Sequence, residues 1–173
     1  PGIEGEILHE DDWATVRSKW LTSQPEEKFI SIEQKDYCNI VVLNTDEELL
    51  LVRQFRIAVE TFSLELPGGL VEKNETPEQT AVRELKEETG ISATTEELKL
   101  LCKLDPDTGR LTNNYWGYML QRYVSTSEVS AEDGIEVLWV DADRVPQMVM
   151  NGTFRHAMHA ATALLATRIS DVI

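Results

Sequence analysis

The chain has few cysteines and no long apolar run. Its 173 residues include two cysteines, Cys38 and Cys102, too few to staple a domain of this size by disulfides, so they favour a reducing compartment. No segment approaches the ~18 uninterrupted apolar residues of a membrane-spanning helix. No basic segment followed by an apolar one opens the chain. We therefore expect a cytoplasmic protein that does not bind membranes.

Basic residues are also scarce. There are 16 Lys plus Arg against 31 Asp plus Glu, for a net charge of −15. So negative a surface repels a phosphate backbone, and we expect no nucleic-acid binding. An anionic small molecule would need metal ions or a few well-placed arginines. With 27% charged and 42% hydrophobic residues, the chain is globular rather than disordered.

The sequence contains no internal repeat, low-complexity tract or linker. We therefore expect one compact domain at 28–173, preceded by a looser N-terminal arm at 1–27. The polar turn at 44–47 predicts a β-hairpin that returns along 48–55. Strands followed by a helix and then further strands and helices indicate a mixed α/β or α+β sandwich. The expected strands are 28–43 (as one or two), 48–55, 61–66, 97–104, 115–124 and 135–140, and the expected helices are 77–89, 143–150 and 153–169.

The helix within residues 69–91 has clear boundaries. Thr76 is a good N-cap, Pro77 suits the first helical position, and Gln79 completes a capping box. Gly90 lies where a left-handed C-terminal cap belongs. These signals predict a helix that begins and ends within the segment.

This helix carries three glutamates on one arc, Glu84, Glu87 and Glu88, at helical spacings of three and four residues. Like charges so placed repel, and one interpretation is a solvated acidic face. Three converging carboxylates are also what a hard cation such as Mg²⁺ binds alongside substrate phosphates. Composition alone leaves both interpretations open.

The segment GLVEKNETPEQTAVRELKEETGI resembles the Nudix box, G-x5-E-x7-R-E-U-x-E-E-x-G-U with U aliphatic. Every defined position matches: Gly69, Glu75, Arg83, Glu84, Leu85, Glu87, Glu88, Gly90 and Ile91. The resemblance extends from about residue 28 to 165. It implies an α/β fold, the Nudix α/β/α sandwich with a mixed β-sheet. It also implies an enzyme that hydrolyses a nucleoside diphosphate linked to another group, using Mg²⁺ or Mn²⁺.

By position, the resemblance makes Glu84 and Glu88 the principal metal ligands. Glu87 would be a further ligand or lie just behind the ligands, and it is also a candidate catalytic residue. The carbonyl of Gly68 would add a neutral oxygen. Glu75 and Arg83 would pair to brace the loop against the helix, a structural role shared with Gly69 and Gly90.

Upstream, VRQFRIAVETFSLELPGG (52–69) resembles the ADP-ribose and nucleoside-diphosphate-sugar branch of the family, in which an R-Q-Y/F-R strand and an E-L/F-P-A/G-G turn recur. Arg56 matches the arginine that grips substrate phosphates there, and Arg53 is a secondary candidate. Glu65 matches an acidic position near the metals. The alternative is that both arginines are ordinary surface residues of a strand.

Downstream, Pro106 stands where ADP-ribose pyrophosphatases commonly carry a proline. The residues that follow lack the commoner S-P-G form of that branch. This departure leaves the sugar or terminal group open.

The general base of this branch usually lies on a loop before a C-terminal strand. Here residues 127–140 offer Glu132, Asp133 and Glu136. Glu132 is favoured, then Asp133, because both precede Gly134 in a loop that can close over substrate. An ordinary acidic loop is the alternative.

Aromatic residues of the N-terminal arm are further candidates. In the branch such residues often stack on the nucleobase, sometimes across a dimer interface, so Trp20 is a candidate substrate contact in an expected homodimer. Trp13 is similar, and a buried anchor is the alternative for both.

His156 and His159 have the spacing of a metal pair, but the apolar stripe of the last helix points His156 away from the core. We therefore expect both to be surface residues. The stripe consists of Phe154, Met158, Ala161, Leu165 and Ile169.

The leading hypothesis is metal-dependent hydrolysis of a nucleoside-diphosphate sugar to a nucleoside monophosphate and a sugar phosphate. The alternative within the family is a nucleoside-triphosphate pyrophosphohydrolase that cleans the nucleotide pool. A non-catalytic metabolite sensor is less favoured, because the box is intact.

Overall fold

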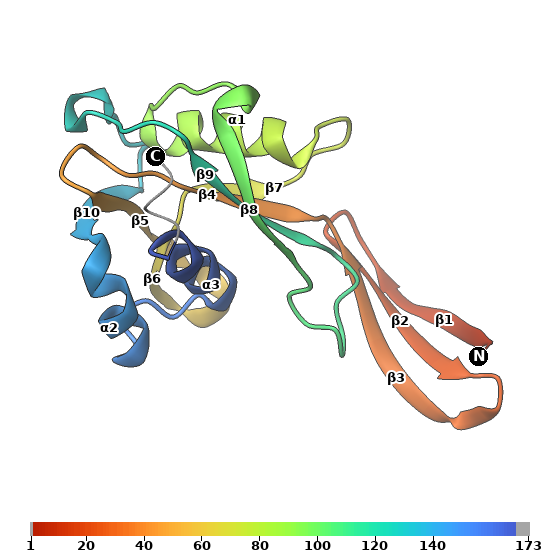
Figure 1. Ribbon diagram of the computed structural model, residues 1–173. Helices are drawn as coiled ribbons and strands as arrows, with labels where there is room; N and C mark the ends of the chain where they lie inside the picture. Colours follow the sequence, from red (N-terminus) through yellow and green to blue (C-terminus); the bar gives the residue numbers. More distant parts are fainter. Residues whose placement is uncertain (1, 169–173) are drawn as a thin grey trace.

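The computed structural model describes residues 2–168, which form a layered body and a projecting N-terminal sheet (Figure 1). In the body, helix α1 (Pro77–Thr89) lies on one side of a four-stranded sheet and helix α3 (Ala157–Ala166) on the other. The predicted α/β/α sandwich is therefore confirmed. Within the described residues, no helix is long and apolar enough to cross a membrane.

The four-stranded sheet is mixed and has the order β7-β4-β9-β8. Its strands β4 and β9 are parallel, and the two outer pairs are antiparallel. A second, antiparallel sheet has the order β10-β5-β6. The bounds are β4 Tyr37–Val41, β5 Glu48–Arg56, β6 Thr61–Glu65, β7 Gly68–Leu70, β8 Leu98–Leu104, β9 Tyr115–Leu120 and β10 Glu136–Asp141.

The predicted hairpin around residues 44–47 exists only next to its turn. Leu43 and Leu49 form an antiparallel bridge, and the Leu50 amide donates to the Val42 carbonyl. Beyond these contacts β4 and β5 separate into different sheets. Residues 38–41 of β4 and 49–52 of β5 are buried, so each strand packs into a core instead of continuing the hairpin.

The N-terminal residues are more regular than the loose arm expected for 1–27. Strands β1 (Ile3–Glu10), β2 (Ala14–Leu21) and β3 (Gln24–Gln34) form an antiparallel sheet in the order β1-β2-β3 that extends away from the body (Figure 1). The predicted strand 28–43 is accordingly split between β3 and β4.

Helix α1 has the predicted caps. The Thr76 side chain accepts from the Gln79 amide while the Gln79 side chain accepts from the Thr76 amide, and Gly90 ends the helix with φ 75°. Its buried residues include Ala81, Leu85 and Glu88. A carboxylate therefore lies on the face of the helix that is turned toward the sheets.

The C-terminal helices differ from the prediction. Helix α2 (Val145–Met150) follows a 3-10 turn, and α3 begins at residue 157 rather than 153. Residues 169–173, the last of the expected domain, lie outside the described residues, and with them Ile169 of the predicted stripe. The 3-10 turns are Ile57–Val59, Thr95–Glu97, Thr126–Glu128 and Ala142–Arg144.

The predicted apolar stripe of the last helix is wrong for α3. Leu165 is 39% exposed, whereas the small residues Ala160, Ala163 and Ala166 are buried. A side chain at Gly117 of β9 would put its Cβ 2.6 Å from the Thr162 hydroxyl, so the glycine permits the helix to approach this strand. The helix packs through small residues, and this reverses the expected face.

Candidate active site

The carboxylates Glu84 and Glu88 of α1 face the turn between β6 and β7. The Gly68 amide donates to Glu88 Oε2 at 3.0 Å. A Cβ at position 69 would lie 2.3 Å from Glu84 Oε1, and one at position 68 would lie 2.2 Å from the Cys38 carbonyl oxygen. Position 68 therefore requires glycine, because a side chain there would meet the backbone of β4, whereas a side chain at position 69 would have to displace the Glu84 carboxylate.

A cleft of about 410 Å³ opens at this turn. It brings together residues from β4, β5, β7, α1 and the start of α3. Its walls are Tyr37, Cys38, Arg56, Gly68, Gly69, Leu70, Glu84, Glu88, His156 and His159.

The two carboxylates are energetically costly as they stand. Burial raises the pKa of Glu88 to about 7; the Gly68 amide opposes this rise, while the charge of Glu84 adds to it. Burial also raises the pKa of Glu84, against hydrogen bonding from Arg83. Buried oxygens that resist ionisation together form a donor set for a hard dication, which would relieve their repulsion. The residues present therefore fit a magnesium or manganese ion.

Arg83 ties the box together. Its guanidinium donates to both oxygens of Glu75, at 2.9 and 3.0 Å, and to Glu84 Oε1 at 2.7 Å. It also donates to the exposed Glu87 at 2.9 Å. Hydrogen bonds, first from Arg83 and then from Thr80, lower the pKa of Glu75 to about 2. This network holds the loop before α1 against the helix.

Arg56 is paired with Glu65 beside the cleft. Its Nε and Nη2 donate to the two carboxylate oxygens at 2.8 and 2.5 Å. Glu65 is 1% exposed; burial works against its ionisation, but hydrogen bonds and charge from Arg56 outweigh this and keep its pKa below the ordinary value. Arg56 has five N–H donors, and this pair leaves some of them for a ligand.

A second cleft, of about 700 Å³, adjoins the first and shares Arg56 and His156 with it. Its other walls are Ala58, Val59, Thr61, Ser63, Glu65 and Arg155. A ligand held by Arg56 can thus extend from the carboxylates of α1 into a larger space.

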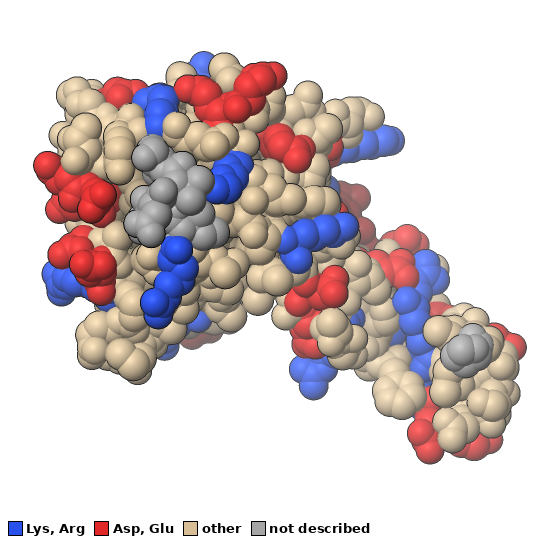
Figure 2. All heavy atoms as spheres, viewed as in Figure 1, with Lys and Arg blue, Asp and Glu red and all other residues tan. Residues whose placement is uncertain are grey.

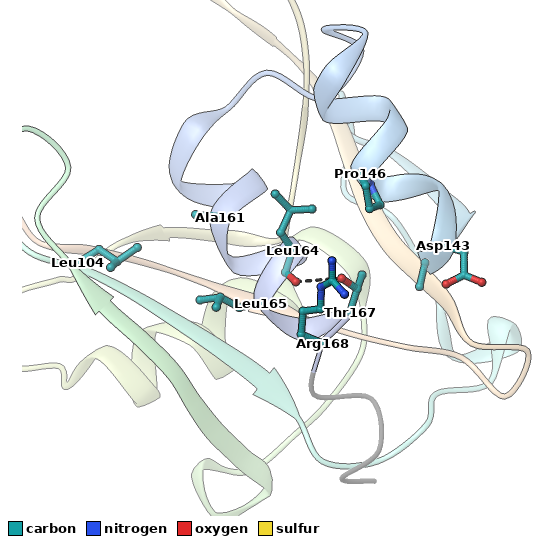
Figure 3. Close-up of a pocket in the computed structure, with 9 residues that line it drawn as sticks. Leu104, Asp143, Pro146, Ala161, Leu164, Leu165, Thr167 and Arg168 are labelled. Atoms are coloured by element: carbon teal, nitrogen blue, oxygen red, sulfur yellow. Dashed lines mark hydrogen bonds between the residues drawn. The ribbon is translucent and has the colours of Figure 1, made fainter.

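A separate hollow of about 680 Å³ lies between α2, α3 and the end of β8 (Figure 3). Its walls are mostly aliphatic and include none of the box carboxylates. It is therefore not the candidate site.

The charged side chains are unevenly distributed over the surface. Acidic side chains gather over α1 and beside β10, while acidic and basic side chains are mixed along the N-terminal sheet (Figure 2).

The expectation that His156 and His159 lie on the surface is wrong. His159 is only 4% exposed, His156 is half-buried, and their ring centroids are 3.8 Å apart. Burial lowers the pKa of both, that of His159 well below its usual value, so both rings are neutral near pH 7. The prediction failed because it placed the buried face of the helix along its large apolar residues, whereas α3 buries its small residues.

Glu65, His156 and His159 offer ligand atoms within 4.8 Å of one another. The hydrogen bond of His159 argues against its being a ligand to such a metal. Arg56 donates to both Glu65 oxygens, and His159 Nδ1 accepts a hydrogen bond from the Leu66 amide at 3.0 Å. A neutral imidazole that accepts at Nδ1 carries its proton on Nε2, which leaves no free lone pair for a cation.

Other sequence-predicted residues lie away from the two clefts. Arg53 pairs with Glu136 at 2.9 Å and stacks over the ring of Phe62. Trp20 lies on β2 of the N-terminal sheet, with Lys28 Nζ 4.9 Å from its ring centroid. Glu87 likewise lines neither cleft.

Glu132 and Asp133 are exposed in the loop before β10. This loop is attached to the end of α1: the Ser130 amide donates to the Thr89 carbonyl at 2.8 Å, and the Glu132 amide to the Glu88 carbonyl at 3.3 Å. The backbone of the candidate base is thus one hydrogen bond from that of a candidate metal ligand, although neither acidic side chain lines the cleft.

Glu88 should make the stability of the metal-free protein depend on pH. Its folded pKa of about 7 exceeds the reference value of 4.5, so between these pH values the folded state holds more protons and stability falls as pH rises. Glu88→Gln should remove a decline on the order of 2–3 kcal/mol, which urea denaturation in chelator at about pH 5 and 8 measures. The exposed Glu87→Gln is the matched control. An undiminished decline in Glu88→Gln would contradict the assignment.

Residues 34–160 match the NUDIX domain family. Among curated relatives, an ADP-ribose pyrophosphatase of Bacillus subtilis is 50% identical over 54 residues, which are 31% of this chain and 29% of that protein. An ADP-sugar pyrophosphatase of Mus musculus is 38% identical over 68 residues, 39% of this chain and 31% of that protein. An 8-oxo-dGTP diphosphatase of Escherichia coli is 35% identical over 83 residues, 48% of this chain and 63% of that protein.

The two pyrophosphatases are thus matched over about a third of their own length. A crystal structure of an ADP compounds hydrolase superposes with a TM-score of 0.74, covering 97% of this chain and 92% of that one. At 19% identity this likeness shows the fold. Because the family match covers most of the chain and includes the box helix, the protein belongs to the Nudix family.

Proposed function

We propose that this protein is an enzyme that hydrolyses the diphosphate bond of a nucleoside-diphosphate sugar of the ADP-ribose or GDP-mannose type. The products would be a nucleoside monophosphate and a sugar phosphate. The observation that carries this proposal is the cleft in which Glu84 and Glu88 meet a glycine turn beside Arg56. The ADP-ribose and ADP-sugar pyrophosphatases among its relatives support the substrate class.

We propose Mg²⁺ as the cofactor, with Mn²⁺ as a substitute, held by Glu84, Glu88 and the Gly68 carbonyl. Bound there, such an ion offsets the charge of the diphosphate, polarises a P–O bond and lowers the pKa of a bound water. Arg83 and Glu75 hold Glu84 in place. Arg56 donates to the phosphates, and Glu65 fixes the orientation of its guanidinium.

The second cleft supports a substrate with a group beyond the diphosphate. It adjoins the carboxylates at Arg56 and His156, and its hydroxyl and apolar walls suit one half of a nucleotide sugar. A nucleoside triphosphate would instead place extra negative charge near the acidic loop before β10, which carries Glu132 and Asp133. The second candidate function is nevertheless nucleoside-triphosphate pyrophosphohydrolysis, favoured by the similarity to the 8-oxo-dGTP diphosphatase.

A product-resolved panel of ADP-ribose, GDP-mannose and nucleoside triphosphates with Mg²⁺ tests the substrate class. We expect a nucleotide sugar to exceed the matching triphosphate in kcat/KM by at least ~10-fold, about 1.4 kcal/mol. A higher kcat/KM for triphosphates, with release of pyrophosphate, would favour the second candidate.

The metal site is tested by variants of its two carboxylates. Glu84→Gln and Glu88→Gln should each reduce turnover at least ~10²-fold, because charge is lost where the dication binds. The exposed Glu96→Gln is the control.

We also propose that the general base lies on the loop before β10, with Glu132 favoured over Asp133. The attachment of this loop to the end of α1 supports the proposal. A loop anchored at Glu88 can close over bound substrate with a short movement.

Glu132→Gln should lower kcat much more than it changes KM, since the carboxylate acts in the chemical step. Asp133→Asn is the matched variant from the next position. An active Glu132→Gln beside an inactive Asp133→Asn would move the base by one residue. Full rates in both would leave water activation to the metal site and box glutamates.

We further propose that the protein is a cytoplasmic homodimer assembled through the N-terminal sheet. Ile7 and Phe29 are 49% and 57% exposed, and the strand register puts them on one face with Arg17 and Lys19. Exposed apolar side chains interspersed with charged ones on a projecting sheet suit a second copy of the chain. In a dimer, Trp20 could reach the substrate of the partner subunit.

The double variant Ile7→Glu, Phe29→Glu should be monomeric in sedimentation experiments, because the charges cannot be desolvated at the interface. Leu100→Glu, at a 48% exposed position on β8, is the control and should remain dimeric. A monomeric unmodified protein would refute this assembly.

A further inference from the structure

The turn between β6 and β7 contains a buried amide that neither flanking strand includes. Leu66 follows the last residue of β6, precedes β7 and is 1% exposed. Its N–H would be left without a partner, which is costly in a protein interior. His159 of α3 supplies the acceptor: the Leu66 amide donates to His159 Nδ1 at 3.0 Å in a buried bond.

This turn is held from three directions. From β4, the Ile40 amide donates to the Pro67 carbonyl at 2.9 Å. From α1, Glu88 accepts from the Gly68 amide. From α3, on the other side of the sheet, His159 accepts from Leu66. Two of these contacts are two residues apart, so a displacement of Leu66 passes directly to the backbone against which Glu88 is set.

Little room exists to absorb such a displacement. The backbone at Gly68 approaches the Cys38 carbonyl too closely for any side chain, and a Cβ at position 69 would meet the Glu84 carboxylate. A shift of the turn would therefore move the Gly68 carbonyl relative to the two carboxylates. The coordination geometry of Mg²⁺ is demanding, so small shifts reduce affinity.

We propose that His159 is a positioning residue of the metal site, acting through the Leu66 amide on Gly68 and Glu88. It accepts at Nδ1 and so carries its proton on Nε2, and it works as a neutral hydrogen-bond acceptor rather than as a ligand. This inference rests on the proposed function in one respect: Gly68, Glu84 and Glu88 are taken to hold the dication.

Variants of His159 with and without an acceptor test the proposal. His159→Leu removes the acceptor and should weaken Mn²⁺ binding at least ~10-fold, the lower range for outer partners of metal ligands. His159→Asn places its amide oxygen where Nδ1 lies and should bind within about threefold of the unmodified protein, by comparison with that ~10-fold loss. The free Mn²⁺ signal in electron paramagnetic resonance measures both affinities without substrate.

Thr162→Val is the matched control from the same helix. Thr162 is fully buried, and its hydroxyl is hydrogen-bonded to Tyr115 and to the Met158 carbonyl rather than to the turn. It should lower the thermal midpoint as His159→Leu does, while leaving Mn²⁺ affinity unchanged. A folded His159→Leu with unmodified Mn²⁺ affinity would overturn the proposal, and its effect would then be one of stability alone.

If His159→Leu does not fold, amide hydrogen exchange in the unmodified protein tests the coupling between Leu66 and the metal site. Because coupling is reciprocal, saturating Mg²⁺ should slow exchange at Leu66 as well as at Gly68. A response confined to Gly68 would overturn the proposal. Glu88→Gln separates the metal assignment from the role of His159. If this variant binds Mn²⁺ as the unmodified protein does, the metal assignment is refuted and this inference with it. If Glu88→Gln loses Mn²⁺ affinity while His159→Leu keeps it in full, only the role of His159 is refuted.

Discussion

The close approach of two α1 carboxylates to the glycine turn is the constraint on which the rest of the site depends. Glu88 is buried and bonded to the Gly68 amide, and Glu84 lies where any side chain at position 69 would be. Burial and mutual repulsion make this arrangement unfavourable in the absence of a cation. The remaining structure of the site serves to hold these oxygens together despite that cost.

Three parts of the fold hold these carboxylate oxygens together. The capping box and Gly90 set the ends of α1, and Arg83 joins Glu75 to the carboxylate of Glu84. The mixed sheet supplies the strand against which the turn packs. Helix α3 contributes from the far side through His159, so the site depends on both outer layers of the sandwich.

The substrate side has a different construction. Arg56 and Glu65 form a pair between neighbouring strands, and Arg56 borders both clefts together with His156. The arginine is thereby oriented before any ligand arrives, which reduces the ordering cost of binding. Although the net charge of the chain is −15, two arginines, Arg56 and Arg155, line the cleft where the substrate phosphates are proposed to bind.

The sequence by itself determined the box helix, its caps, the layered α/β class and the identity of the box carboxylates. These features depend on local spacing: capping bonds span three residues, and helical neighbours are three or four apart. The sequence also pointed to Arg56, through the strand and turn that precede the box, and the structure places this residue at the cleft. The pairing of Arg53 with Glu136 was not predicted, because it joins residues 83 positions apart.

Only the tertiary structure decided the rest. It folded residues 3–34 into a projecting sheet, of which the local pattern predicted only the part from residue 28, because β1 and most of β3 are exposed and lack a buried alternating face. It also turned the histidines of α3 inward. That orientation depends on Gly117 of a distant strand letting small residues of α3 pack closely, and on a Leu66 amide that needs an acceptor. Both are contacts across long sequence separations, which the periodicity of a single helix cannot contain.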